Sequence, residues 1–344
     1  MKLAVGLGYW GAGTSADEQL ALTKEAERLG YSSVWVAEAY GSDAVTVLTW
    51  LATQTTTIGL GSGILQMFAR SPGMTAMTAA TLDTLSGGRL LLGLGLSGPQ
   101  VVEGWYGQRY DRPLARTREY VDLVRKILRR EVIDHQGEVY QLPLPDSQGK
   151  PLKLIIRPLR ESIPIYLAAI GPKNVALAGE IADGWLPAFF SPDHMDEFMP
   201  ALEEGASRAA RSVEDIDIAP SCAVAIGDDL QTCYDWVRPA YGLYLGGMGS
   251  RKHNFYNALA ARYGFGDEAQ RVQELYLSGD KFGAYSAVPE DLIDATALIG
   301  PAERVAERMK RYEAAGVTTL IVQPAAGSLE DKIAILERLK EMTG

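Results

Sequence analysis

Residues 3–37, LAVGLGYWGAGTSADEQLALTKEAERLGYSSVWVA, contain the pattern that decides the fold. Two short apolar runs, residues 3–7 and 33–37, flank a segment over residues 16–29 whose apolar positions recur at helical spacing. Gly30 directly follows that segment and supplies the left-handed residue with which many helices end. The stretch therefore predicts a strand, a helix and a second strand parallel to the first.

The helix also carries a start signal, because Ser15 and Glu18 have the spacing of a capping box. The alternation then continues, with helices expected over residues 43–53 and 74–85. Six further strands are expected over residues 57–62, 89–94, 164–168, 184–187, 216–225 and 318–322. Eight strands separated mostly by helices favour an α/β fold of the (β/α)₈ TIM-barrel type, as one domain over residues 1–344, rather than an open doubly wound sheet.

Two segments are too long for the minimal repeat. Residues 131–156 predict a hairpin and a loop rich in Pro and Gly, outside the barrel. Residues 241–288 include GLYLGGMGSRKHNFY and a helix expected near residues 268–278. We expect these insertions at the C-terminal mouth of the barrel, where long ordered loops usually cover a site or an interface.

Charge and composition exclude several classes of protein. The net charge of −10 disfavours binding to nucleic acid or to an anionic membrane. No apolar run approaches the roughly 20 residues of a membrane span, and the N-terminus lacks the features of a signal peptide. With only Cys222 and Cys233, the simplest location is a reducing cytoplasm. The three histidines, His135, His194 and His253, lack metal-ligand spacing, so no metal is expected.

Two stretches match the GxGxxG pattern, GLGYWG at residues 6–11 and GLGLSG at residues 93–98. The first could indicate a dinucleotide site, but its helix begins several residues after the glycines. Glu38 also follows Gly11 by 27 residues, whereas the acidic residue of a dinucleotide motif follows by about 20. Tight turns and close strand packing are the better interpretation for Gly6, Gly93 and Gly95.

Other glycines are placed to meet a ligand. Gly61, Ser62 and Gly63 end the third strand without a large side chain, which would let a planar ring approach the backbone. Later, Gly171 and Pro172 open a helix after the fifth strand.

The free N–H groups of Lys173 and Asn174 at that helix start would face the mouth and favour an anion. The Lys173 side chain could add a positive charge there. Alternatively, it is simply solvated, as most surface lysines are.

The residues quoted so far belong to longer stretches that resemble the luciferase-like family of flavin and F420 oxidoreductases. The stretches are LGYWG (7–11), AERLGYSSVWVAEAYGSDA (26–44), IGLGSGIL (58–65), TLDTLSGGRLLLGLGLSGPQVVEGWYG (81–107), GPKNVALAGEIADGWLP (171–187) and YEAAGVTTLIV (312–322). TLDTLSGGR followed by LGLG is the most specific of them. SGPQVVEGWYG is more similar to the F420-dependent branch than to the FMN-dependent monooxygenases.

This resemblance implies a ring system laid against the end of the third strand, where a non-proline cis peptide is expected at Gly63–Ile64 or next to it. It also implies that the coenzyme phosphate and tail lie near Ser97, Gly98 and the helix start at residues 171–174, after Ala169. A homodimer is implied as well. The expected cofactor is coenzyme F420, with FMN as the alternative.

The candidate catalytic residues are Glu38 and Tyr9. In relatives, an acidic residue at the position of Glu38 lies near the ring, where it could orient the cofactor or move a proton. A salt bridge or a cap for the next turn is the alternative role. Tyr9 and Trp10 could line the substrate side, or they could be core packing.

The chain departs from the sugar-phosphate dehydrogenases of the family, because Ala39 stands where they have a histidine. Pro99 or a neighbour also replaces their acidic residue after the fourth strand. Glu103 could substitute for that acid, or it could pair with Arg109 or Arg112.

The sequence thus predicts a hydride-transferring F420-dependent oxidoreductase acting on a small organic substrate, with His253 and Tyr256 as possible substrate contacts. An FMN-dependent monooxygenase and a non-catalytic flavin-binding barrel are the alternatives.

Overall fold

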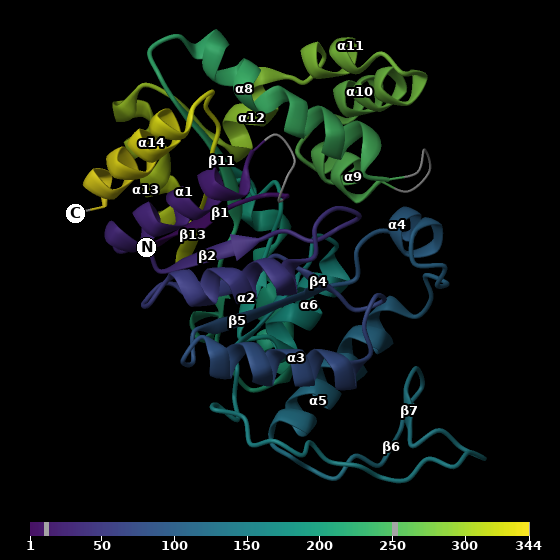
Figure 1. Ribbon diagram of the computed structural model, residues 1–344. Helices are drawn as coiled ribbons and strands as arrows, with labels where there is room; N and C mark the ends of the chain where they lie inside the picture. Colours follow the sequence, from purple (N-terminus) through teal and green to yellow (C-terminus); the bar gives the residue numbers. More distant parts are fainter. Residues whose placement is uncertain (10–13, 250–253, 344) are drawn as a thin grey trace.

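The computed structural model describes residues 1–9, 14–249 and 254–343 (Figure 1). One curled sheet contains eleven strands: β1 (Lys2–Gly6), β2 (Ser33–Val36), β3 (Gly59–Ser62), β4 (Leu65–Gln66), β5 (Leu90–Gly95), β8 (Ile165–Ala168), β9 (Gly184–Leu186), β10 (Asp217–Ile218), β11 (Ser221–Ile226), β12 (Leu298–Gly300) and β13 (Thr319–Pro324). All pairings within this sheet are parallel, in the order β10-β9-β8-β5-β3-β2-β1-β13-β11-β12, and β4 also pairs with β5. Their carboxyl ends therefore meet at one edge.

Most strands are followed by helices. The helices are α1 (Ala16–Arg28), α2 (Ala44–Gln54), α3 (Pro72–Leu85), α4 (Pro99–Gly104), α5 (Pro113–Leu128), α6 (Pro172–Ile181), α7 (Met199–Arg208), α8 (Leu230–Gly242), α9 (Phe255–Arg262), α10 (Gly266–Ser278), α11 (Lys281–Ser286), α12 (Glu290–Thr296), α13 (Ala302–Ala314) and α14 (Leu329–Met342). The described residues also form two short 3₁₀ turns, η1 (Pro192–Glu197) and η2 (Val213–Asp215), and one π-helical turn, η3 (Leu243–Gly247).

The predicted strands are confirmed, with one refinement. Each of the eight expected segments falls on an observed strand, but the seventh is divided at Ala219 and Pro220 into β10 and β11. Pro220 has no N–H to give to a neighbouring strand, which interrupts regular pairing there. The short strands β4 and β12 were not predicted, because two or three residues carry no measurable alternation.

The expected start and end of α1 are also confirmed. The Ser15 hydroxyl accepts a hydrogen bond from the backbone N–H of Glu18, while the Glu18 carboxylate accepts one from the N–H of Ser15. Gly30 has a φ of 73°, the left-handed conformation that favours glycine. Leu22 and Ala26 on one face of this helix are buried in the core.

Close packing explains the glycines at three strand positions. A Cβ atom on Gly93 would lie 1.8 Å from the Ser62 carbonyl oxygen, and one on Gly95 would lie 2.7 Å from the Ile64 side chain. A Cβ on Gly6 would lie 2.9 Å from the Gln323 side chain. Neighbouring backbone at Gly93 and neighbouring side chains at Gly6 and Gly95 thus occupy the space of a Cβ atom, which agrees with the packing interpretation.

The two long insertions lie on opposite sides of the sheet in Figure 1. Within residues 131–156, the strands β6 (His135–Gln136) and β7 (Gln141–Leu142) pair antiparallel. Within residues 241–288, η3, α9, α10 and α11 pack together beyond the carboxyl end of the sheet. The helix expected near residues 268–278 is confirmed as α10. Among the described residues, none of the helices is long and apolar enough to cross a membrane.

The contact between β3 and β5 gives a test of the fold. We predict that Gly93→Ala lowers the free energy of unfolding by about 1–3 kcal/mol or more, because the new methyl group would clash with backbone that cannot rotate away. Gly104→Ala is the matched control, since a Cβ there has nothing within 4 Å. Urea unfolding followed by circular dichroism measures both variants. Equal stability of the two would contradict this packing role.

Candidate active site

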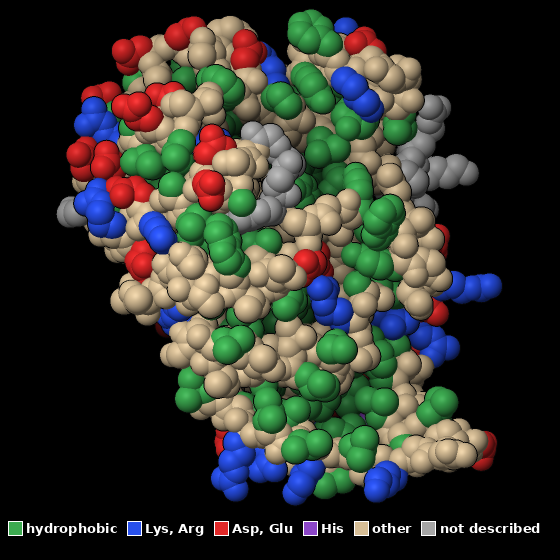
Figure 2. Space-filling model, viewed as in Figure 1, with side chains coloured by type: hydrophobic (Ala, Val, Ile, Leu, Met, Phe, Trp, Pro, Cys, Tyr) green, Lys and Arg blue, Asp and Glu red, His purple; other side chains and the backbone are tan. Residues whose placement is uncertain are grey.

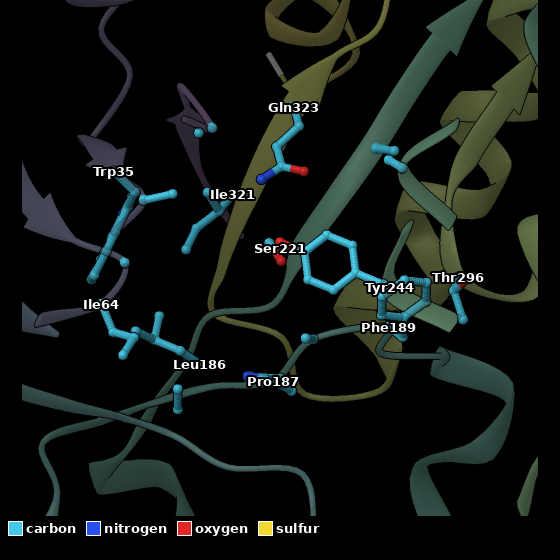
Figure 3. Close-up of a pocket in the computed structure, with 18 of the residues that line it drawn as sticks. Trp35, Ile64, Leu186, Pro187, Phe189, Ser221, Tyr244, Thr296, Ile321 and Gln323 are labelled. Atoms are coloured by element: carbon cyan, nitrogen blue, oxygen red, sulfur yellow. The ribbon is translucent and has the colours of Figure 1, made fainter. Parts of the chain in front are cut away.

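A cavity of about 230 Å³ opens at the carboxyl edge of the sheet (Figure 3). Its walls come from the ends of β1, β2, β3, β8, β9, β11 and β13, and from the segments α8, η3 and α9. Figure 2 shows a depression in the visible face, below the position of α10, and hydrophobic side chains line it. Parallel strands bring residues far apart in sequence to this one edge, the usual place for a ligand site in such folds.

One wall of the cavity is the bulge after β3. Gly63 and Ile64 line the cavity together with the Trp35 indole from β2. The peptide bond between Gly63 and Ile64 is cis, at the position that the resemblance implied. Ile64 can extend over β5 because Gly95 has no side chain. The bulge therefore presents one half-buried aliphatic side chain and an open stretch of backbone.

Gly61 and Ser62 precede the bulge and do not line the cavity. A Cβ atom on Gly61 would lie 2.3 Å from the Trp35 indole, so that indole occupies the space expected for a ligand. The Ser62 hydroxyl is fully buried; it donates to the Gly93 carbonyl and accepts from the Gly93 N–H, each at 2.9 Å. Both residues thus shape the bulge from behind, and only Gly63 and Ile64 of this group face the cavity.

The opposite wall is aromatic. The Phe189 ring packs edge-on against the rings of Tyr241 and Tyr244, and Tyr244 packs edge-on against Tyr256. Burial raises the pKa of each of the three phenols, so they stay protonated and neutral at physiological pH. Of this wall, only Tyr256 was singled out from the sequence. The aromatic residues of AYGLYLGG in the insertion were the signal that could have identified Tyr241 and Tyr244.

Tyr9, at the end of β1, lies beside this wall. Its hydroxyl is 3.5 Å from that of Tyr244, and burial raises its pKa. Tyr9 also lines a neighbouring apolar hollow of about 210 Å³ with Tyr40, Leu243 and Met248. It therefore contacts the cavity, as the substrate-side interpretation requires. Trp10 and His253 lie outside the described residues.

Polar groups on β11 and β13 form the floor. The Gln323 amide projects into the cavity, which Ser221 also lines (Figure 3), and Gly6 leaves room for the Gln323 side chain. No hydrogen bond of the Gln323 amide to another described residue is found. Thr296, in contrast, is engaged, because its hydroxyl lies 2.6 Å from that of Tyr241. Sequence reasoning missed Gln323, since its inward direction depends on the register of β13.

Glu38 lies behind the cavity rather than on its surface. Its carboxylate pairs with the Arg70 guanidinium and accepts a hydrogen bond at 2.9 Å from the N–H of Ala44, at the start of α2. The Glu38 and Arg70 side chains are only 4% and 18% exposed. The Gln66 side-chain amide donates to the Glu38 carbonyl at 3.4 Å, which links this pair to β4 just after the bulge. Glu38 thus forms a salt bridge and caps the start of α2, which are the contacts expected for its alternative, structural role.

The start of α6 lies next to the cavity. Ala168, at the end of β8, lines both the main cavity and a small hollow that also touches Ala169 and Asn174. Gly171 precedes the helix without a side-chain cap, and Pro172 is its first residue. The N–H of Asn174 donates a hydrogen bond to the Gly171 carbonyl at 3.0 Å. The prediction that this N–H is free was therefore wrong.

Lys173 is exposed and lines a separate groove with Arg118 and Arg208. Asn174, in the first turn of α6, lines the hollow, so the positive end of the helix dipole lies close to it.

The remaining candidates are scattered. Ser97 has a positive φ of 61°, and Gly98 is the N-cap residue of the short helix α4, near Met248. The exposed Glu103 accepts a hydrogen bond from the N–H of Tyr110 rather than from an arginine. Among the described residues, no group of three or more metal-ligating side chains occurs.

Comparison with known proteins identifies the class. The profile of the family described as luciferase-like monooxygenase matches residues 4–319. A Mycobacterium tuberculosis protein, provisionally named a coenzyme F420-dependent oxidoreductase, is 46% identical over 337 residues, which cover 96% of each chain. The chain is therefore a member of the luciferase-like family of enzymes.

Two further relatives agree with this placement. The 5,10-methylenetetrahydromethanopterin reductase of Methanopyrus kandleri is 29% identical over 326 residues, or 90% of each chain. The solved F420-dependent tetrahydromethanopterin reductase from that organism superposes with a TM-score of 0.84 at 25% identity, over 99% of this chain and 97% of the other. Its fold is thus shared along almost the whole length.

The buried ion pair behind the bulge gives a second test. We predict that Glu38→Gln lowers the free energy of unfolding by about 3–5 kcal/mol, because it leaves the Arg70 charge buried without its partner. The double variant Glu38→Gln/Arg70→Met should recover part of this loss.

Glu138→Gln is the control for this test, since its ion pair with Arg112 is solvent-exposed and should contribute at most about 1 kcal/mol. Chemical denaturation of the four proteins measures the effect. A Glu38→Gln protein as stable as the control variant would show that the pair does not support the fold.

Proposed function

We propose that this enzyme is a coenzyme F420-dependent oxidoreductase, transferring a hydride between the deazaflavin C5 of the coenzyme and a small organic substrate. The observation that carries the proposal is a cavity lined by Gly63, Ile64 and Ala168, with a small hollow at the start of α6 that Ala168 also lines. F420 needs a flat surface for its ring system and a positive site for its anionic arm. The relatives whose names include coenzyme F420 support the same cofactor.

The described residues fit such a group. Gly63 and Ile64 would support the ring system, since they are open to the cavity while Gly61 and Ser62 are covered. Ala169 and residues 171–174 would receive the anionic arm at the positive end of the α6 dipole. Ser97 and Gly98 belong to the same proposal as contacts to the tail. When bound, the coenzyme supplies the hydride chemistry, so the protein's task is to position the reactants and exclude water.

The side chains would act around that chemistry in distinct ways. Tyr9 and Tyr244 present neutral hydroxyls, whose raised pKa values keep their protons available as hydrogen-bond donors. Tyr9 is the candidate catalytic residue that contacts the cavity. Glu38 would act as a positioning residue, because its contacts with Arg70, Ala44 and Gln66 hold the segment after the bulge.

We also propose that the curled sheet closes into an eight-stranded (β/α)₈ barrel, in one domain over residues 1–344. Only Ala219 and Pro220 separate β10, which pairs with β9, from β11, which pairs with β13. The insertions at about 131–156 and 241–288 would be excursions from this barrel. The cytoplasmic location and the homodimer predicted from the sequence belong to the same proposal; both cysteines are free and buried, which is consistent with a reducing compartment.

Cofactor titration tests the proposal. We predict that F420 quenches the intrinsic tryptophan fluorescence saturably, because Trp35 lines the cavity, and that FMN binds at least about tenfold more weakly. Asn174→Asp should weaken F420 binding roughly tenfold or more, since it places a negative charge at the proposed anion site. Gln54→Glu is the matched control, because it makes the same amide-to-carboxylate change at an exposed position at the end of α2. Saturable binding of FMN alone would overturn the F420 assignment.

A further inference from the structure

The cavity lining contains no charged side chain among its described residues. None of them is Asp, Glu, Lys, Arg or His. The ion pair of Glu38 with Arg70 is buried behind the bulge and outside the lining. The phenols of Tyr9, Tyr244 and Tyr256 add no charge either, because burial keeps them protonated.

Such a lining discriminates against ionic ligands. Moving a carboxylate or phosphate from water into a cavity without a cation costs much more than moving a ketone or an alcohol. The rings of Phe189, Tyr241, Tyr244 and Tyr256 offer a large apolar contact surface instead. Apolar or aromatic ligands gain free energy from burial against such a surface.

The Gln323 amide is a polar group of this surface that is available to a ligand. It lies on β13 beside Ala223 of the neighbouring strand β11, projects into the cavity and has no hydrogen-bond partner among the described residues. An amide can donate to a carbonyl oxygen or accept from a hydroxyl group. Gly6 keeps the amide accessible, since a Cβ there would lie 2.9 Å from the Gln323 Cγ.

Resting on the proposed oxidoreductase function, we infer that the substrate is an uncharged, largely apolar molecule with one carbonyl or hydroxyl oxygen. The Gln323 amide binds that oxygen, and the aromatic wall of Phe189, Tyr241, Tyr244 and Tyr256 binds the apolar body. The Ser221 hydroxyl, two residues before Ala223 on β11, lines the same cavity and offers a second polar group to the substrate. Sugar phosphates, carboxylates and other anions are disfavoured as substrates, because the described residues of the lining offer no counter-charge.

Matched probes test this inference by binding alone. We expect cyclohexanone to bind at least about tenfold more tightly than 4-oxocyclohexanecarboxylate, measured by ligand-observed NMR titration of the wild-type protein with and without F420. Gln323→Leu should weaken cyclohexanone binding roughly three- to tenfold, while binding of methylenecyclohexane, which lacks the oxygen, should not weaken. Gln136→Leu, at an exposed site in the β6–β7 hairpin, is the control and should change neither.

A gain-of-function variant completes the test. Gln323→Lys would place a cation in the cavity, so the carboxylate probe should bind at least about tenfold more tightly than it does to wild type. Equal or tighter wild-type binding of the carboxylate probe, no binding of cyclohexanone, or an unchanged cyclohexanone affinity in Gln323→Leu would overturn the inference. Failure of F420 to bind the same samples would instead count against the proposed cofactor, so the two failures are distinguishable.

Discussion

The hydrogen bonds between the Ser62 hydroxyl and the Gly93 backbone fix the part of the molecule on which the site depends. They join the ends of β3 and β5 at a point where a Cβ on Gly93 could not fit. Two residues further along each strand, Gly95 leaves room for Ile64 to lie over β5. The bulge that presents Gly63 and Ile64 to the cavity is therefore a consequence of close strand contact.

A second set of contacts supports the bulge from the other side. The Trp35 indole occupies the space beside Gly61, and the ion pair of Glu38 and Arg70 holds the start of α2 and the segment after the bulge together. The charges of this pair thus lie behind the site, where they stabilise the fold, while the described residues of the cavity surface carry no charge. This separation explains how an acidic protein can offer a largely apolar binding surface.

Local signals predicted most of the fold because they act over a few residues. The capping box of Ser15 and Glu18 and the positive φ of Gly30 needed only the sequence of one helix. The site was harder, since its contacts join distant segments. Arg70 lies 32 residues from Glu38, and nothing local distinguishes a catalytic carboxylate from a paired one. Likewise, Gly61 looked open to a ligand until the position of Trp35 was known.

The same reasoning explains why Gln323 and the tyrosines of the insertion were found only in three dimensions. Their side chains meet because parallel strands end at one edge and residues 241–288 fold back over it. A crystal structure of the protein with coenzyme F420 bound would test the central claim most directly. We predict a ring system resting on Gly63 and Ile64, with the anionic arm at residues 171–174 and the free face turned toward the aromatic wall. A coenzyme bound elsewhere, with this cavity left empty, would contradict the proposed site.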